Sequence, residues 1–127
     1  MTRAILPALA LLLAAVLLPS VALAGGDAAK GESVFRRCVI CHTIKAGDPN
    51  RLGPNLHGLF EREAGKAPGF TAYSEGLKDA TYNWDDAKLD QWLANPQEFS
   101  KGARMAFRVT DEGERQDLIA YLHQATK

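Results

Sequence analysis

Two cysteines three residues apart, followed directly by a histidine, constrain this chain more than any other feature: Cys38, Cys41 and His42. The C-x-x-C-H pattern is the signature of covalent haem attachment. Each thiol can add to one vinyl group of a haem, and the adjacent histidine is then held beneath the iron as an axial ligand. The pattern therefore predicts one covalently attached haem c, with thioethers at Cys38 and Cys41 and iron bound by His42.

Three other interpretations of the cysteine pair compete with this one: a dithiol redox pair, half of a zinc site, and a structural disulfide. A zinc site needs further Cys or His ligands, and the remaining histidines, His57 and His123, are far apart in the sequence. A thioredoxin-like pair needs a βαβ context, which the sequence pattern does not indicate. A disulfide leaves the directly following His42 without a role.

The N-terminal segment has the composition of a leader. A short positive region containing Arg3 precedes an apolar run over residues 4–18, and the sequence Ala22-Leu23-Ala24 supplies a cleavage pattern. The apolar run is short for a membrane-spanning helix, which needs about 20 residues. We therefore expect residues 1–24 to be a cleavable signal peptide, with an uncleaved membrane anchor as the alternative. Because bacterial haem attachment takes place outside the inner membrane, the leader predicts a periplasmic location.

Cleavage would leave residues 25–127 as a single small domain. Loss of Arg3 would give that domain a net charge of −1, which argues against nucleic-acid binding. Basic side chains form one group around the cysteines and a second group around Met105. The first comprises Arg36, Arg37, Lys45, Arg51, Arg62 and Lys66, and the second comprises Lys101, Arg104 and Arg108. If both groups lie at one haem edge, the molecule has a charge dipole, and the alternative is an ordinary solvated surface.

Capping residues and apolar periodicity predict four or so short helices joined by long loops. We expect helices over residues 28–38, 74–78, 85–95 and from a cap at Thr110 to about residue 122, with loops over 46–58, 61–70 and 97–109. Loops this long need something to pack against. The pattern therefore predicts an all-α domain wrapped around one haem, with Trp84 and Trp92 in the core.

The opposite face of a haem bound by His42 needs a sixth ligand. Met105 is the only methionine of the predicted mature chain, and it lies in an irregular loop that can present its sulfur. His123 is the competing candidate, but it lies near the end of the last predicted helix. Histidine–methionine ligation raises the reduction potential of a haem and fills both axial positions. The expected task is therefore one-electron transfer rather than substrate conversion.

Several motifs recur in the order typical of one family. They are Gly31-Glu32, Phe35, Cys38–Thr43, Gly53–Leu59, Ala67–Phe70, Asn95-Pro96, Gly102, Met105, Phe107 and Asp117–Leu122. On these motifs the chain resembles a class I c-type cytochrome, in particular the group of cytochrome c2 and mitochondrial cytochrome c. The resemblance covers essentially all of residues 25–127.

The resemblance implies a haem-enclosing helical fold, with specific roles for residues of this chain. The first and last helices would cross at Gly31, Phe35, Leu118 and Tyr121. His42 and Met105 would be the axial ligands, and the Pro54 carbonyl would accept a hydrogen bond from His42. Arg62, Tyr73 and Trp84 would contact the haem propionates, and the basic residues would form a rim that docks acidic partners.

Three residues depart from the family pattern. Ala72 is an extra residue before Tyr73, relative to the mitochondrial sequences. Trp92 stands where a tyrosine near the methionine sulfur is usual, and Ala103 replaces a threonine that supplies a hydroxyl beside the haem. The last two changes alter the surroundings of the haem.

These features together predict a soluble, monomeric electron carrier that is not an enzyme. It would accept electrons from a bc1-type complex and deliver them to a terminal oxidase or a photosynthetic reaction centre, through transient electrostatic docking. One alternative is a membrane-tethered carrier. The other is a peroxidase-like enzyme or ligand sensor with a labile sixth ligand.

Overall fold

The computed structural model describes residues 25–127, so the predicted signal peptide over residues 1–24 lies outside the described part of the chain. That part contains five α-helices and one 3-10 helix: α1 (Ala28–Phe35), η1 (Leu59–Glu61), α2 (Glu75–Lys78), α3 (Asp86–Ala94), α4 (Pro96–Phe99) and α5 (Glu112–Ala125). Between residues 25 and 127 the only β-type pairing is an isolated bridge from Glu63 to Asn83. The predicted all-α class is confirmed.

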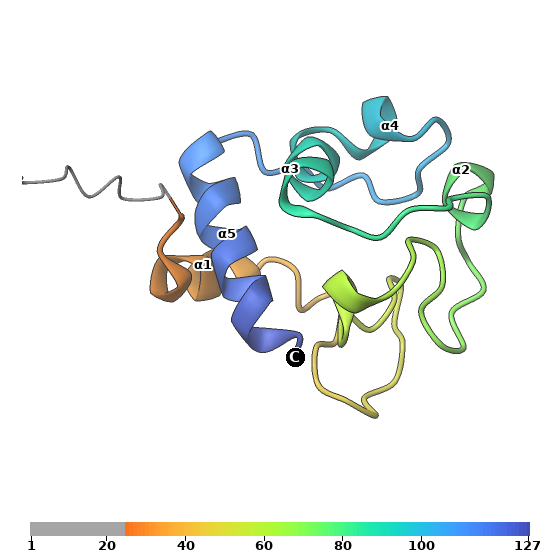
Figure 1. The fold of residues 1–127 in the computed structure, drawn as a ribbon, viewed down its shortest axis with the longest axis horizontal. Coiled ribbons are helices and arrows are strands. Elements are labelled where there is room, and N and C mark those ends of the chain that lie inside the picture. Colours follow the sequence, from red (N-terminus) through yellow and green to blue (C-terminus); the bar gives the residue numbers. More distant parts are fainter. Residues whose placement is uncertain (1–24) are drawn as a thin grey trace, which may run out of the picture.

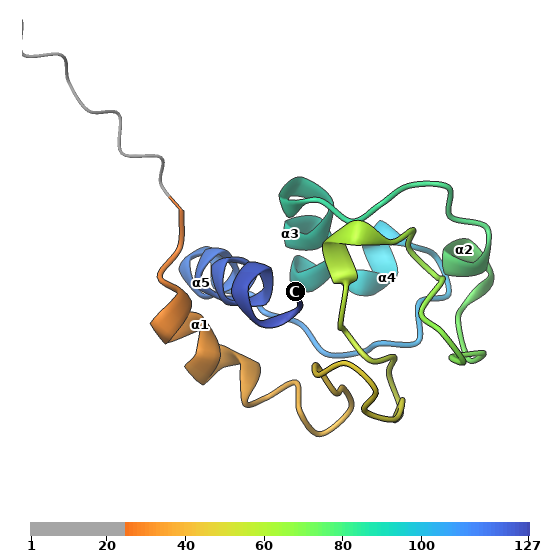
Figure 2. The same ribbon diagram turned by 60° about the horizontal axis from the view of Figure 1, so that its bottom comes forward.

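Helices α1 and α5 lie side by side and cross, although they stand at opposite ends of the described chain (Figures 1 and 2). The Asp27 carboxylate caps α1 by accepting from the N–H groups of Ala29 and Lys30. A Cβ at Gly31 would lie 1.9 Å from the backbone oxygen of Asp117 on α5. Only a glycine therefore allows the two backbones to approach this closely.

Helix α1 ends at Phe35, whereas the sequence predicted that it extends to Cys38. The N–H of Arg37 bonds to the carbonyl of Val34, and that of Cys38 to the carbonyl of Phe35. These three-residue spacings tighten the chain into turns, as is common at the end of an α-helix. The cysteine pair therefore lies in a turn directly after α1.

Helix α3 begins and ends close to the predicted positions, but α4 was not predicted. Asp85 caps α3, and Asn95 follows its last residue. The Asn95 side chain then accepts from the N–H of Glu98, and Pro96 occupies the first turn of α4. Proline suits that position because its missing N–H would have no helical partner there. The residue that ends one helix therefore begins the next.

The last helix begins one residue later than predicted, because Asp111 rather than Thr110 caps it. The Asp111 carboxylate accepts from the N–H of Glu114 at 2.8 Å. The structure also adds η1 in a region predicted to be loop, beginning after Gly58, which has a φ of 68°. A positive φ at that position favours glycine.

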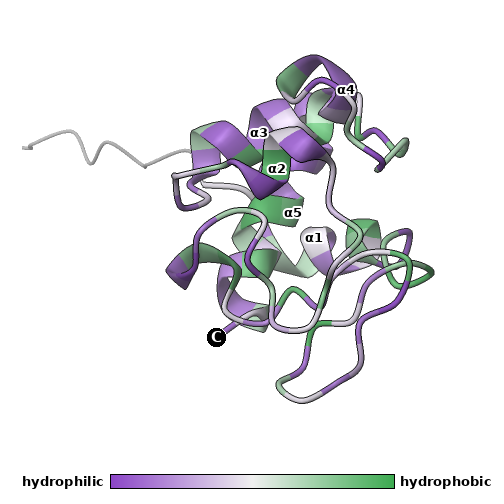
Figure 3. Cartoon of the chain, turned by 90° about the vertical axis from the view of Figure 1, so that its right-hand side faces the viewer, coloured by the Kyte–Doolittle hydropathy of each residue, from purple (hydrophilic) through white to green (hydrophobic). Residues whose placement is uncertain are grey.

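The core is assembled from α1, α3, α5 and the loops that pass between them. Figure 3 shows hydrophobic segments of α5 toward the middle of the molecule. Trp84 and Trp92 are both buried, as predicted, and their rings meet edge to face with centroids 5.6 Å apart. Of the helices in residues 25–127, none combines the length and apolar character that a membrane crossing requires.

Candidate haem-binding site

His42 is held in one orientation by the loop that follows it. Its Nδ1 lies 2.8 Å from the backbone oxygen of Pro54. Because a carbonyl can only accept, Nδ1 carries the proton and Nε2 presents a lone pair. Burial lowers the pKa of His42, and the bond to Pro54 opposes that shift. The side chain therefore favours the neutral form, which is the form that binds iron.

Gly53 provides a cradle for the His42 ring. A Cβ at this position would lie 2.3 Å from Cε1 and 2.7 Å from both ring nitrogens. The loop backbone is tied to the cysteine turn, because the Gly53 N–H donates to the carbonyl of Cys41 at 2.8 Å. The loop thus packs against the face of the imidazole and holds its plane.

Cys38 and Cys41 share the turn that presents His42. The N–H groups of Cys41 and His42 both donate to the carbonyl of Cys38, at 3.1 and 2.9 Å. Both thiols are free and partly exposed. Burial raises the pKa of Cys38 to about 11, with an opposing contribution from the charge of Arg37. The turn therefore presents two free thiols and a fixed imidazole within five residues.

Met105 lies partly buried in the segment between α4 and α5, against the hydrophobic core. Ala103, at the position of the family's threonine, is buried at 4% exposure. The predicted roles of Cys38, Cys41, His42 and Met105 in haem binding stay predictions, because the structure contains only protein atoms.

Arg62 and Tyr73, two of the three residues predicted at the haem propionates, are tied to loop backbone. The Arg62 guanidinium donates to the carbonyls of His57 and Asn55. The Tyr73 hydroxyl accepts from the N–H of Ala67 at 3.1 Å. The extra residue, Ala72, is exposed, so the chain accommodates it without exposing Tyr73.

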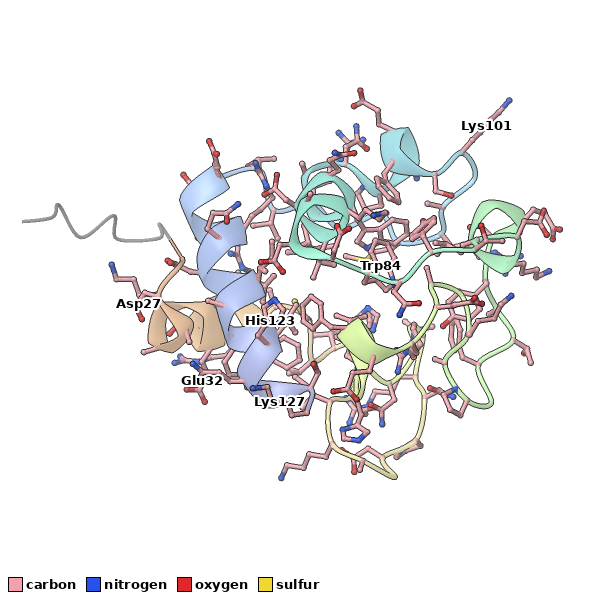
Figure 4. All side chains as sticks on the ribbon, viewed as in Figure 1. Asp27, Glu32, Trp84, Lys101, His123 and Lys127 are labelled. Atoms are coloured by element: carbon pink, nitrogen blue, oxygen red, sulfur yellow. The ribbon has the colours of Figure 1, made fainter. Side chains whose placement is uncertain are left out.

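Trp84, the third residue predicted at the propionates, belongs to an aromatic cluster. Figure 4 shows it on the inner side of the molecule, and its ring stacks on Phe99 with centroids 5.7 Å apart. The structure does not join Trp84 by any hydrogen bond to Arg62 or Tyr73. Its predicted propionate contact therefore stays a prediction.

Ser74 is a candidate site residue that the sequence reasoning missed. Its position before α2 suggested a helix cap, but its side chain makes no capping hydrogen bond. The Oγ atom is buried and has no hydrogen-bond partner among the described residues. A buried hydroxyl without a partner is costly, so an acceptor from outside the protein is its natural complement. Ser74 follows Tyr73 directly, which places it at the predicted propionate side.

The residues present therefore fit a covalently attached haem. The cradle at Gly53 and the bond to Pro54 hold the His42 imidazole in one orientation with Nε2 able to bind iron, and the two thiols are free. The orphaned hydroxyl of Ser74 suits a carboxylate oxygen. No group of three or more His, Cys, Asp or Glu side chains in residues 25–127 is arranged to hold a metal ion by itself.

The two remaining histidines are engaged elsewhere. The ring of His123, labelled on α5 in Figure 4, stacks on Phe60 with centroids 3.8 Å apart. Its Nε2 lies 2.6 Å from the Asp86 carboxylate on α3. His57 is partly buried, and its carbonyl accepts from Arg62. Neither histidine is joined to Met105 or His42 by a hydrogen bond, and neither ring stacks on the His42 ring.

Arg37 of the first basic group contacts Phe107, the residue before Arg108 of the second group. The Arg37 guanidinium lies over the Phe107 ring, 5.9 Å from its centroid. Lys101 points away from the molecule beside α4 (Figure 4). Among residues 25–127, four large apolar side chains are exposed, and all of them lie near the cysteine turn or in the Met105 segment. They are Val39, Ile40, Leu52 and Phe107, at 43%, 75%, 82% and 40% exposure.

Comparison with known proteins gives a consistent result. The family model described as Cytochrome c matches residues 28–126. A cytochrome c of Arabidopsis thaliana is 42% identical over 104 residues, which cover 80% of this chain and 92% of that protein. A cytochrome c of Chlamydomonas reinhardtii is 45% identical over 103 residues, covering 80% and 91%. A cytochrome c of Cochliobolus lunatus is 42% identical over 104 residues, covering 80% and 95%.

The comparison corrects the predicted location. These relatives come from plants, fungi and a green alga, whereas a periplasm is a bacterial compartment. The prediction of a periplasmic location is therefore wrong. The apolar run over residues 4–18 has the composition of a leader, but that composition alone does not specify a compartment.

The matches extend over most of the chain and at about 40% identity, so the resemblance to class I c-type cytochromes is confirmed. Binding of one covalent haem c is confirmed with it, as is the expectation that the protein is not an enzyme. The chain belongs to the cytochrome c family, whose members carry electrons on a single haem enclosed by short helices.

Proposed function

We propose that His42 and Met105 are the axial ligands of the haem iron and that Cys38 and Cys41 form its thioether links. The observation that carries this proposal is the 2.8 Å hydrogen bond from His42 Nδ1 to Pro54. It fixes the tautomer, leaves Nε2 free to bind, and increases the basicity of the ligand nitrogen. The neighbouring thiols are in the same turn, so attachment would hold the haem against this nitrogen.

The haem, when bound, supplies a one-electron ferric–ferrous couple. With Met105 as the second ligand, both axial positions are filled, which leaves no site for oxygen or a substrate. Ser74, Arg62, Tyr73 and Trp84 would lie on the propionate side. There the buried Ser74 hydroxyl would donate to a carboxylate, and Arg62 would provide a positive charge.

We further propose that the protein shuttles electrons from a bc1-type complex to an acceptor complex through an exposed haem edge. A terminal oxidase is the acceptor to test first, and a photosynthetic reaction centre is the second acceptor that the sequence predicted. The mostly exposed basic groups around the cysteine turn and Met105, together with the exposed Ile40 and Leu52, support a weak docking surface. Such docking would be transient, would involve a monomer, and would be steered by charge.

Residues 1–24 would be removed before the protein acts, leaving a domain over residues 25–127. The intact mass of the protein isolated from its own cells tests this point. A mass that includes residues 1–24 would instead support the membrane-tethered carrier.

The ligand assignment is tested with Met105→Leu, which removes the sulfur but conserves the side-chain volume. We expect loss of the sulfur-to-iron absorption band of the ferric protein, a lower reduction potential, and binding of carbon monoxide by the reduced protein. Leu77→Met adds a thioether elsewhere in the core and is the control that should retain the band. A Met105→Leu variant with the band and potential of the parent protein would rule out Met105 as the ligand.

The electron-shuttle proposal is tested by the rate at which an isolated terminal oxidase oxidises the reduced protein. We expect this rate to fall as ionic strength rises, because salt screens the steering charges. Lys45→Gln, in the first basic group, should slow the reaction at low salt. Lys30→Gln, on the exposed side of α1 and outside both groups, should not. Equal rates at all ionic strengths would contradict electrostatic docking.

A further inference from the structure

The segment that carries Met105 is held mainly at its two ends. The upstream end is fixed by a bond from the Ala103 N–H to the carbonyl of Ser100 at 2.9 Å. The downstream end is fixed by a bond from the Val109 N–H to the carbonyl of Leu93 at 2.8 Å. Among the described residues, no hydrogen bond between backbone groups involves residues 104–108. The position of Met105 therefore depends on how firmly these ends are anchored.

Arg115 on α5 reinforces the downstream end. One terminal nitrogen of its guanidinium, Nη1, donates to the carbonyls of Val109 and Thr110, at 3.1 and 3.0 Å. Its Nε donates to the Asp90 carboxylate on α3 at 2.7 Å. The planar guanidinium of Arg115 thus joins α3 and α5 to Val109 and Thr110, the residues at the downstream end of the Met105 segment.

Helix α3 contributes a second contact from the next turn. Asp90 and Leu93 are three residues apart and lie on one face of α3. The Asp90 carboxylate holds Arg115, and the Leu93 carbonyl accepts from the Val109 N–H, so both residues of α3 act on the chain at Val109. Val109, which bonds to both Leu93 and Arg115, is buried at 1% exposure. The Gln116 amide also donates to Asp90, at 3.1 Å. We call Arg115, Asp90 and the Val109 backbone the clamp.

The clamp differs from the other ion pairs of the protein in its burial. The side chains of Arg115 and Asp90 are 12% and 28% exposed. The hydrogen-bonded pair His123 with Asp86, also between α3 and α5, has side chains 44% and 66% exposed, and neither residue is hydrogen-bonded to the Met105 segment. Exposed pairs contribute little to stability, whereas removal of one partner from a largely buried pair leaves a charge without its complement.

We propose that Arg115 is a positioning residue for Met105, acting through the clamp. Arg115 holds Val109 and Thr110 against α3. This restricts the conformational freedom of residues 104–108, between Ala103 and Val109, so that the Met105 sulfur stays at the iron. Without Arg115, the segment opens locally while α1, α3 and α5 remain folded. This inference rests on the proposed ligation of iron by Met105.

The test uses the holoprotein with imidazole as the probe, because imidazole competes with the methionine sulfur for ferric iron. We expect Arg115→Gln to increase the affinity for imidazole about tenfold, which corresponds to about 1.4 kcal/mol of lost segment closure. Asp90→Asn should give a similar increase. Arg115→Lys should restore part of the closure, since it keeps the charge but loses the planar fork.

Asp86→Asn is the matched control, because it removes the carboxylate that contacts His123 between the same two helices and belongs to no part of the clamp. Its affinity for imidazole should equal that of the parent protein. Amide hydrogen exchange supplies a second readout: in Arg115→Gln, exchange should increase at residues 104–109 and remain unchanged in α1.

Three results would overturn the proposal. The first is an unchanged imidazole affinity in Arg115→Gln when the parent protein shows the sulfur-to-iron band. The second is an equal increase in Asp86→Asn, which would mean that general loosening of α3 and α5 is responsible. The third is a parent protein that lacks the band, and only this result would also remove the proposed ligation by Met105.

Discussion

Replacement of Gly31 by alanine tests whether the close crossing of α1 and α5 holds the fold together. Intrinsic helix propensity favours alanine over glycine by about 1 kcal/mol, so an isolated α1 would become more stable. In the structure the new Cβ would lie 1.9 Å from the Asp117 oxygen and 2.5 Å from its carbonyl carbon. Both atoms belong to the backbone of α5 and cannot move aside as a flexible side chain would.

The two helices must therefore separate, and the contacts they bury must loosen. Overpacking of a core typically costs 1–3 kcal/mol, and a clash of backbone with backbone belongs at the upper end of that range. After subtraction of the gain in helix propensity, we expect Gly31→Ala to lower the free energy of unfolding by about 2 kcal/mol.

Unfolding of the holoprotein in guanidinium chloride, followed by far-ultraviolet circular dichroism, measures this change. Gly113→Ala is the matched control, because it makes the same substitution in α5. Its Cβ would have only the flexible Asp111 carboxylate nearby, at 3.2 Å. We expect this control to be unchanged or more stable by up to about 1 kcal/mol. A Gly31→Ala variant as stable as Gly113→Ala would refute the argument from the crossing.

Three further predictions concern the site. Gly53→Ala should push the His42 ring out of its cradle and weaken its bond to Pro54, with a loss of about 1–3 kcal/mol in unfolding free energy, measured in guanidinium chloride, and an altered visible spectrum. Ser74→Ala should lower the reduction potential, measured by redox titration, because it removes a donor from a carboxylate, while an unchanged potential would contradict that contact. Burial raises the pKa of the Tyr73 hydroxyl, and the Ala67 N–H and the charge of Arg62 oppose that shift. The contribution of Tyr73 to the free energy of unfolding is therefore complete below the ordinary pKa of tyrosine and is lost as the pH rises past that pKa. Tyr73→Phe should therefore make unfolding free energy, measured between pH 8 and pH 11, fall less steeply than in the parent protein.

The sequence was sufficient where chemistry is local. The C-x-x-C-H motif predicts haem attachment at the cysteine turn without reference to the rest of the chain, since both thiols and the imidazole lie within one segment of five residues. The start of α1 follows from the carboxylate of Asp27, which can reach N–H groups two and three residues onward. For the same reason α3 was predicted to begin at Asp85 or Asp86.

Two elements of a single turn, α4 and η1, were not predicted from the apolar pattern. Helix α4 and η1 are four and three residues long, so neither contains a repeat of the apolar pattern that distinguishes a helix from a loop. The end of α1 was misplaced for a related reason. Apolar residues return at Cys38 after two arginines, so the apolar pattern does not mark Phe35 as the last residue of the helix. The change from α-helical to tighter bonding there is a matter of backbone geometry that composition does not record.

The parts of the site that depend on distant residues were the hardest to foresee. Ser74 looks like a helix cap in its local sequence, and its role as an unsatisfied buried donor appears only when α2 is packed. In the sequence, Arg115 resembles an ordinary exposed residue in a first helical turn that is rich in glutamate. In the structure its side chain is only 12% exposed and is hydrogen-bonded to Asp90 and to the Val109 carbonyl. Within the described chain, residues 104–108 make no hydrogen bonds between backbone groups, so their own sequence does not fix the position of Met105. The side chains and carbonyls that hold the downstream end come from Asp90 and Leu93 on α3 and from Arg115 on α5.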